Sequence, residues 1–368
     1  MKNRFVDLAV SGLAELKPYV PGKPIAELER ELGISGSVKL ASNENPLGVS
    51  PAVSKAIEQA LPELARYPDG GGYALRQALA AKHAVDPMAI TLGNGSNDVL
   101  DMLARAFLGP GRESLFSQYA FAVYPLSSQA VGATLVQAPA RDYGHDLQAM
   151  ADRITDRTRL IWIANPNNPT GTWLPRTALR AFLEQVPEQT IVVVDEAYTE
   201  YVQQAEYPDA SLWLADFPNL IVTRTFSKAY GLASLRVGYG LSHPDLADLL
   251  NRVRQPFNVN SLAQVAALAA LQDQAFIAQS VQVNGAGMRQ LCDGFERLGL
   301  DYIPSVGNFV TLDLGDRLGA EVDQALLREG CITRPIGGYG MPHHLRVSVG
   351  LKSENTRLLE ALEKVLNS

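Results

Sequence analysis

Short apolar runs alternate with helical patterns of hydrophobic and polar residues between about residues 38 and 241. Three of these runs, at residues 160–164, 191–194 and 220–223, are almost continuously apolar, which is typical of strands that are buried on both faces. Because strands alternate with helices here, the pattern predicts strand–helix–strand units and a mostly parallel central sheet flanked by helices.

Polar residues follow each of the three expected strands. Asn165 follows the first strand, Asp195 the second, and Arg224 with Thr225 the third. In open α/β sheets, ligands bind in the crevice beyond the carboxyl ends of the strands. The three endings therefore predict one binding crevice along this edge of the sheet.

The pattern changes near Pro256. The elements expected beyond it are a helix at residues 261–272, strand-like runs at 309–312 and 345–349 within a mixed segment, and a closing helix at about 353–366. A chain of 368 residues is long enough for about two domains. We therefore expect an α/β fold with a large domain of residues 31–260, and a smaller α+β domain of residues 261–368 joined by residues 1–30.

The charge and the cysteines disfavour several classes of partner. A net charge of -7 would repel the phosphates of a nucleic acid. Cys292 and Cys331 are far apart and have no metal-like spacing, which argues against a disulfide framework or a metal site. Asp7 and Glu15 interrupt any secretory segment, and no apolar window is long enough to span a membrane. We expect a cytoplasmic protein with no nucleic-acid, membrane or metal partner.

Lys228 comes just after the third strand, with Ser227 beside it and Arg236 further along. A lysine amine attacks a carbonyl only when it is unprotonated, and an apolar pocket or a cationic neighbour lowers its pKa toward working pH. A solvated surface lysine is the ordinary alternative. The position beyond a buried strand, beside residues suited to an anion, favours a lysine that forms a Schiff base.

Residues 93–98, Gly-Asn-Gly-Ser-Asn-Asp, precede an amphipathic helix that we expect to run to about Leu108. The free N–H groups and the positive dipole at such a helix start can bind a phosphate. The segment is not a dinucleotide fingerprint, because Asp98 stands where a third glycine is needed, and it has no Gly-Lys-Ser/Thr sequence. An ordinary capped helix is the alternative interpretation.

Two further motifs follow strands. Residues 165–171, Asn-Pro-Asn-Asn-Pro-Thr-Gly, predict a rigid turn that would hold Asn168 over the crevice. Asp195 ends an aliphatic strand, so its carboxylate should be nearly buried and should need a cationic or N–H partner to stay charged. Its alternative role is to cap the next helix. Tyr198 would face the same crevice if a helical turn begins there.

Together, these motifs resemble the site of fold-type-I pyridoxal-phosphate enzymes, in the same order and across nearly the whole chain. Within that superfamily, the chain resembles the histidinol-phosphate aminotransferase family. The motifs that carry this resemblance are Asn43-Glu44-Asn45-Pro46, Arg66-Tyr67-Pro68, Asn167-Asn168-Pro169-Thr170-Gly171, Asp195-Glu196-Ala197-Tyr198 and Leu345-Arg346-Val347-Ser348-Val349-Gly350. The resemblance implies the fold-type-I architecture of a large domain with a mostly parallel central sheet and a smaller α+β domain.

The resemblance implies that the cofactor is pyridoxal 5′-phosphate and gives roles to the residues around its ring. Lys228 would hold the cofactor in a Schiff base and shuttle the proton between the substrate α-carbon and the cofactor. Asp195 would pair with the pyridine nitrogen and keep it protonated, because a pyridinium ring is the electron sink that makes the α-proton removable. Asn168 and Tyr198 would hydrogen-bond the phenolic oxygen and help to keep it ionised.

The resemblance also implies contacts to the face and the phosphate of the cofactor. Phe121 would stack on the ring, with Tyr119 as the competing candidate. The phosphate would be held by Ser96, Asn97, Thr225, Ser227 and Arg236. Tyr67 would reach the phosphate of the neighbouring subunit, which implies a homodimer with two shared active sites.

On the substrate side, the resemblance implies that Arg334 and Arg346 together grip the substrate anion, because a planar guanidinium binds a carboxylate or a phosphate bidentately. A solvated strand-end arginine is the alternative for Arg346. Asn43 and Tyr19 would line the substrate side, with Tyr19 closing like a lid.

The implied reaction is a reversible ping-pong transamination between two small molecules, L-histidinol phosphate and 2-oxoglutarate, which forms imidazole-acetol phosphate and L-glutamate in histidine biosynthesis. An aromatic-amino-acid aminotransferase on the same scaffold is the main alternative, and a phospho-amino-acid decarboxylase is a more distant one. A regulator that uses the fold to bind an effector would need a DNA-binding domain, for which the residues before Asn43 are too few and too little basic. A nicotinamide dehydrogenase is disfavoured by the missing third glycine.

Overall fold

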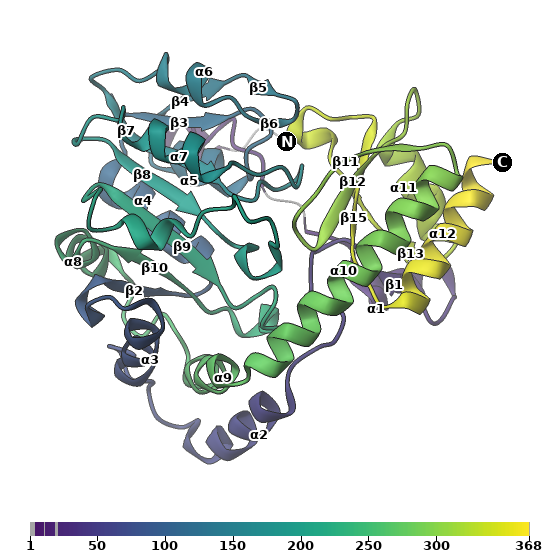
Figure 1. The fold of residues 1–368 in the computed structure, drawn as a ribbon, viewed down its shortest axis with the longest axis horizontal. Helices are drawn as coiled ribbons and strands as arrows, with labels where there is room; N and C mark the ends of the chain where they lie inside the picture. Colours follow the sequence, from purple (N-terminus) through teal and green to yellow (C-terminus); the bar gives the residue numbers. More distant parts are fainter. Residues whose placement is uncertain (1–3, 11, 19–20, 368) are drawn as a thin grey trace.

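The computed structural model describes residues 4–10, 12–18 and 21–367, and it consists of two units that a long helix connects (Figure 1). The larger unit is built on a seven-stranded sheet with the strand order β2-β10-β9-β8-β7-β3-β4. The strands are β2 (Ile90–Gly93), β3 (Glu113–Ser117), β4 (Thr134–Ala138), β7 (Thr158–Ala164), β8 (Ile191–Asp195), β9 (Leu220–Thr225) and β10 (Gly238–Ser242). β10 pairs antiparallel with β2 and β9, and the other four strand pairs are parallel, so the expected mostly parallel α/β sheet is confirmed.

The alternating burial of the central strands explains the continuous apolar runs in the sequence. Trp162 of β7 packs in the hydrophobic cluster on one face of the sheet, whereas Ile161 and Ile163 pack in the cluster on the other face. Successive strand residues point to opposite faces, so a strand covered on both sides needs apolar residues throughout. The same alternation places Asp195 on the face of Val193, and Glu196 lies one position beyond it.

Helices cover both faces of this sheet. The helices of the larger unit are α2 (Pro51–Ala60), α3 (Tyr73–His83), α4 (Ser96–Phe107), α5 (Val123–Ala130), α6 (Leu147–Ala151), α7 (Arg176–Leu183), α8 (Pro244–Val253) and α9 (Ser261–Gln272). Helices α4, α5 and α8 share one hydrophobic cluster with the sheet, and α6 and α7 share another on the opposite face. Between β4 and α6, the short strands β5 (Ala140–Arg141) and β6 (Gly144–His145) form a hairpin.

The smaller unit is built on an antiparallel four-stranded sheet with the order β11-β12-β15-β14. Its elements are α1 (Ile25–Leu32), β1 (Val38–Lys39), α10 (Gln274–Arg297), β11 (Asp301–Ile303), β12 (Phe309–Asp313), α11 (Gly319–Arg328), β13 (Cys331–Ile332), β14 (Arg334–Pro335), β15 (His344–Ser348) and α12 (Lys352–Leu366). Leu312 and Leu345 on one face of this sheet pack against α10, α11 and α12. The alternate residues Thr311 and Arg346 lie on the other face, which meets the larger unit.

At both expected domain boundaries, the segment that follows the boundary packs with the unit that precedes it. Strand β1 pairs with β13 in the smaller unit although it follows residue 31, because Leu28 and Ala41 pack with Leu327 of α11. Helix α9 follows residue 260, yet it packs against α2 and α3 of the larger unit. The division at residues 31 and 261 stays a prediction, and these contacts favour boundaries after Ala41 and after Gln272.

Helix α10 is a structural element that the sequence pattern did not predict. It spans 24 residues, and its first part packs with the larger unit through Ile277, whereas Leu291 and Phe295 pack in the core of the smaller unit. The helix therefore joins the two units as a single rod (Figure 1).

Within the described ranges, every helix is too short or too polar to cross a membrane. The same ranges contain no group of three or more histidine, cysteine, aspartate or glutamate side chains placed to hold a metal ion.

Candidate active site

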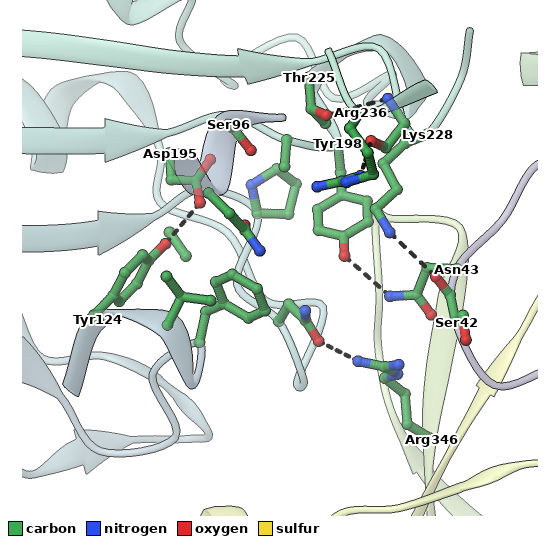
Figure 2. Close-up of a pocket in the computed structure, with 18 residues that line it drawn as sticks. Ser42, Asn43, Ser96, Tyr124, Asp195, Tyr198, Thr225, Lys228, Arg236 and Arg346 are labelled. Atoms are coloured by element: carbon green, nitrogen blue, oxygen red, sulfur yellow. Dashed lines mark hydrogen bonds between the residues drawn. The ribbon is translucent and has the colours of Figure 1, made fainter. Parts of the chain in front are cut away.

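A pocket of about 320 Å³ lies where the carboxyl edge of the large sheet faces the small sheet (Figure 2). It includes the predicted site residues Asn43, Ser96, Asn97, Phe121, Asn168, Asp195, Tyr198, Thr225, Ser227, Lys228, Arg236 and Arg346 in its lining. These residues come from segments as far apart as positions 43 and 346 in the sequence. One crevice therefore holds these residues, but Asn165 and Arg224, which also served to predict it, lie outside its lining. The Asn165 side chain accepts a hydrogen bond from the backbone N–H of Leu174, and Arg224 pairs with Glu196.

Asp195 lies at the end of β8 and is only 5% exposed. Its Oδ1 accepts a hydrogen bond of 2.9 Å from the Thr223 hydroxyl, and its Oδ2 accepts one of 2.9 Å from the Tyr124 hydroxyl. Burial raises the pKa of the carboxyl, and these hydrogen bonds and the charge of Lys228 oppose that rise. Both of these donors are hydroxyl groups, and the cationic or N–H partner that the sequence predicts for Asp195 stays a prediction.

Lys228 points into the pocket from the loop after β9, and its Nζ donates a hydrogen bond of 3.1 Å to the Ser42 carbonyl oxygen (Figure 2). Burial, followed by the positive charge of Arg346, lowers the pKa of Lys228 to about 7. A large fraction of the amine is therefore unprotonated at neutral pH. This is the state that a lysine nucleophile requires.

A cup of polar groups lies at the start of α4. The side chain of Ser96 and that of Asn97 in the first turn line the pocket, and the Arg236 Nη1 donates a hydrogen bond of 3.2 Å to Ser227 Oγ. Gly95 precedes the helix with φ +79°, and a Cβ at this position would lie 2.3 Å from Arg236 Nη2. The absence of a side chain at Gly95 lets the guanidinium approach the helix start, where N–H groups and the dipole both favour an anion.

Arg346 forms the opposite wall from the middle of β15. Its Nη1 donates a hydrogen bond to Asn168 Oδ1, and its Nη2 donates one of 2.7 Å to the Ala41 carbonyl oxygen. The guanidinium carbon lies 5.4 Å from the centre of the Phe309 ring. Arg346 is 5% exposed, so the alternative interpretation as a solvated strand-end arginine is wrong.

Asn43 and Tyr198 connect the two walls. The Asn43 Nδ2 donates a hydrogen bond of 3.0 Å to the Tyr198 hydroxyl, and the Asn43 Oδ1 accepts one of 2.9 Å from Ser348 of β15. Asn43 adopts a left-handed backbone conformation with φ 55°. Burial raises the pKa of Tyr198 to about 12, so its hydroxyl stays protonated and can donate a hydrogen bond into the pocket.

The positions of Phe121 and Tyr119, the two candidates for stacking on the cofactor ring, differ. Phe121 lines the pocket, whereas Tyr119 packs with Ile303, Ile336 and Met341 outside it. The prediction of Phe121 as the stacking residue therefore has the better geometric support.

Two predicted residues lie outside the pocket lining of their own chain, and a third lies outside the described residues. Tyr67 is 82% exposed and stacks on Phe257 with ring centroids 4.7 Å apart. Arg334 pairs with Arg346 across the small sheet but does not belong to the pocket lining. Tyr19 lies outside the described residues. The roles of these three residues remain predictions.

The sequence argument missed the two hydroxyl groups that hold Asp195. Thr223 was detectable, because it lies two positions before Thr225 on the same face of β9. Tyr124 lies in α5, and the local pattern contains no sign that its hydroxyl faces a strand 71 residues later.

The chain matches the family described as "Aminotransferase class I and II" over residues 35–362. The chain belongs to this family. It is 59% identical over 368 residues to the protein named "Histidinol-phosphate aminotransferase 2" of Pseudomonas fluorescens strain Pf0-1, covering 100% of this chain and 99% of the relative. It is 60% identical over 364 residues to the protein of the same name from Pseudomonas aeruginosa strain PAO1, covering 98% of each.

Solved structures of aminotransferases are similar to this chain. The histidinol-phosphate aminotransferase from Sinorhizobium meliloti, determined in complex with pyridoxal-5′-phosphate, superposes with a TM-score of 0.87 at 31% identity and 95% coverage of each chain. The Thermus thermophilus aspartate aminotransferase with maleate gives a TM-score of 0.83 at 23% identity, covering 96% of this aminotransferase and 98% of that chain. The second likeness shows the fold alone, which is the expected fold-type-I architecture.

Proposed function

We propose that this aminotransferase uses pyridoxal 5′-phosphate to transfer the amino group of L-histidinol phosphate to 2-oxoglutarate, reversibly, in histidine biosynthesis. The observation that carries the proposal is the placement of three groups in one pocket: an amine with a pKa of about 7 on Lys228, a buried carboxylate on Asp195, and the anion cup at the start of α4. The names of the relatives that share 59–60% of its residues support the same substrate.

The residues in the pocket fit this cofactor. Asp195 is buried with hydrogen bonds from neutral hydroxyl groups, so a cationic ring nitrogen would complete its charge balance. The cup around Gly95 and Arg236 suits a phosphate, since a side chain at Gly95 would fill the space that the guanidinium uses. Phe121 supplies an aromatic surface in the lining.

When bound, pyridoxal 5′-phosphate supplies an electrophilic carbon and an electron sink for the α-proton. Lys228 would provide the amine that binds this carbon, and its Nζ would carry the α-proton, since its pKa of about 7 suits a group that both accepts and donates a proton. Asp195 would hold a proton on the ring nitrogen. Tyr198 and Asn168 would orient the ring through its oxygen, because the centre of the Tyr198 ring lies 5.7 Å from Lys228 Nζ and Asn168 accepts a hydrogen bond from Arg346.

Arg346 is the residue that we assign to the substrate anion. Its guanidinium already binds the side chain of Asn168 and the backbone at Ala41, so its orientation is set before a substrate arrives. We assign Asn43, Arg334 and Tyr19 to the same side, as the family resemblance implies.

We also propose that two copies of the chain form a homodimer with shared active sites in the cytoplasm. Tyr67 supports this, since a tyrosine that is 82% exposed beside the 45%-exposed Phe257 presents an aromatic surface that a second subunit would cover. The size of the protein in solution, measured by light scattering with and without a Tyr67→Asp substitution, tests the assembly.

Side-by-side kinetics test the substrate. With pyridoxal 5′-phosphate and saturating 2-oxoglutarate, we expect kcat/KM for L-histidinol phosphate to exceed that for L-phenylalanine by at least about 100-fold. The reason is that the wrong substrate leaves buried polar groups unpaired, which lowers its kcat/KM. A preference for phenylalanine would establish the aromatic aminotransferase instead. Release of carbon dioxide in place of glutamate formation would establish a decarboxylase.

A further inference from the structure

Tyr124 is a buried residue in the pocket lining that the reaction outlined above does not use. It lies in α5, it is fully buried, and its hydroxyl donates a hydrogen bond of 2.9 Å to Asp195 Oδ2 (Figure 2). Burial and the neighbouring carboxylate raise the pKa of Tyr124 well above its usual value, so it remains a donor throughout the physiological range.

The position of this hydroxyl is set by a rigid support on the far side of the ring. The Tyr124 ring stacks on Trp162 of β7 with centroids 5.1 Å apart and an interplanar angle of 6°. The Trp162 Nε1 donates a hydrogen bond of 2.8 Å to Ser114 Oγ, which lies 2.7 Å from Ser128 Oγ. The Ser128 hydroxyl in turn donates to the Tyr124 carbonyl oxygen at 2.7 Å. Strands β3 and β7 and helix α5 thus hold the ring and its backbone together.

We propose that Tyr124 is a positioning residue that keeps Asp195 ionised and aims its carboxylate at the cofactor ring nitrogen. The inference rests on the proposed function and adds a residue to it. Thr223 donates to one carboxylate oxygen and Tyr124 to the other, so both oxygens of the carboxylate are held. A single donor would leave the carboxylate free to rotate.

The charge balance explains why a second donor is needed. The titratable groups that face Asp195 in the described structure are Tyr124 from α5, Tyr198 ahead of the turn Thr199–Tyr201, and Lys228 after β9. Both tyrosines stay neutral, and Lys228 loses its charge near neutral pH. A buried carboxylate without a lasting cationic partner takes up a proton unless hydrogen bonds stabilise its charged form.

The effect of the tyrosine hydroxyl has a predictable size. A hydrogen bond to a charged group corresponds to about one to two pKa units. Removing the hydroxyl would therefore raise the pKa of Asp195 by about that amount and would protonate it at a higher pH. A protonated Asp195 cannot hold the ring nitrogen as a cation, so the affinity for the cofactor falls as the pH decreases.

The test measures noncovalent binding of pyridoxal 5′-phosphate from about pH 5 to about pH 9, a range chosen to include a raised carboxyl pKa. The reference protein carries Lys228→Ala, so that no covalent bond masks the affinity. In this background, we expect Tyr124→Phe to weaken binding by about 10- to 100-fold at the acid end and to converge on the reference at the alkaline end. Phenylalanine keeps the ring that stacks on Trp162 and removes only the donor.

Two further variants separate positioning from packing. In an Asp195→Asn background, Tyr124→Phe should leave the pH profile unchanged, because no carboxyl remains to titrate. Tyr239→Phe removes another buried tyrosine hydroxyl, that of Tyr239 on β10, which lies 2.9 Å from Nε2 of His83. This variant should reproduce the reference profile. Urea unfolding of each protein verifies that it is folded.

The outcomes are distinct. Parallel profiles for Tyr124→Phe and the reference, or equal weakening at every pH and in the Asp195→Asn background, would overturn the assignment of Tyr124. If the protein with Lys228 intact failed to bind pyridoxal 5′-phosphate at all, the proposed function itself would be wrong.

Discussion

The two walls of the pocket are constructed in different ways. On the wall of the large sheet, Asp195 stands at a strand end, and its partners Tyr124 and Thr223 belong to the same unit. On the wall of the small sheet, Arg346 stands in the middle of a strand, and its guanidinium binds Asn168 of the larger unit and the backbone at Ala41. The first wall therefore holds its own geometry, whereas the second depends on how the two units meet.

This difference suggests that the two walls bind different parts of the reacting complex. Under the proposed function, the cofactor belongs to the large-sheet wall and the substrate anion to the small-sheet wall. Movement between the units would then change the affinity for the substrate before it changes the affinity for the cofactor. Four experiments test this division, beginning with the one that has the largest expected effect.

The first variant removes the amine of the large-sheet wall. Lys228→Ala should reduce kcat by about 10⁴-fold or more, because both the nucleophile and the proton carrier are lost. Steady-state transamination and the visible absorbance of the bound cofactor measure the loss. Lys364→Ala, at a side chain that is 69% exposed and pairs with Glu329, is the matched control and should leave both unchanged. A Lys228→Ala enzyme with wild-type turnover would contradict the assignment.

The second variant acts on the small-sheet wall. Arg346→Lys should reduce kcat/KM by about 30- to 1,000-fold, since lysine cannot replace a buried, bidentate guanidinium and truncation leaves its partners unpaired. The effect should appear mainly in KM for the substrate. The affinity for pyridoxal 5′-phosphate should stay within a few-fold of wild type. Arg252→Lys, at a side chain that is 71% exposed, is the control. An equal loss of cofactor affinity would break the proposed division between the walls.

The third experiment uses the lowered pKa of Lys228 in the cofactor-free protein. Below about pH 7, the amine is charged in both folded and unfolded chains, so the cost of burying the charge is fully present. Between pH 7 and the usual lysine pKa of 10.5, only the unfolded chain keeps the proton, and stability rises with pH. Lys228→Met should thus be more stable than wild type by about 1–3 kcal/mol at acid pH, with the gap closing toward alkaline pH.

Urea denaturation at a series of pH values measures this gap, and Lys364→Met provides the exposed control. A constant gap across the pH range would mean that the Lys228 amine titrates normally in the folded protein.

The fourth variant has the smallest expected effect and returns to the anion cup. Gly95→Ala should weaken binding of pyridoxal 5′-phosphate by about tenfold, since its Cβ would lie 2.3 Å from Arg236 Nη2 and would displace the guanidinium. Gly111→Ala is matched in backbone strain, with φ +80°, but has open space at the Cβ position. It should cost about 1–2 kcal/mol of stability and leave cofactor affinity unchanged. If the two variants bound the cofactor equally well, Gly95 would have no specific role in binding the phosphate.

The pocket lining could be predicted from the sequence where a residue lies at the end of a local element. Asp195, Asn168 and Lys228 each follow a strand that the apolar runs identify, and all three line the pocket. Local patterns are enough to predict these positions because the carboxyl ends of all the parallel strands lie at the same edge of the sheet.

Helix α10 shows why part of the fold was missed. Gly287 and Gly294 weaken the helical signal in the sequence, because glycine is a poor helix former. In the folded protein, a Cβ at Gly287 would lie 2.5 Å from Val349, and one at Gly294 would lie 2.5 Å from Leu359. These glycines allow the helix to pack closely against the smaller unit. Close packing between distant segments therefore overrides the local preference.

The sequence by itself determined the parallel sheet, the two-unit plan, the helix start that suits an anion, and the polar residues at the strand ends, because each depends on neighbours within about one element. Only the tertiary structure decided that the Tyr124 hydroxyl meets Asp195, and that Arg346 lies within hydrogen-bonding distance of Asn168, 178 positions earlier. Such pairs depend on strand register and on the contact between the two sheets, and these are set by the burial of the whole core rather than by any local pattern.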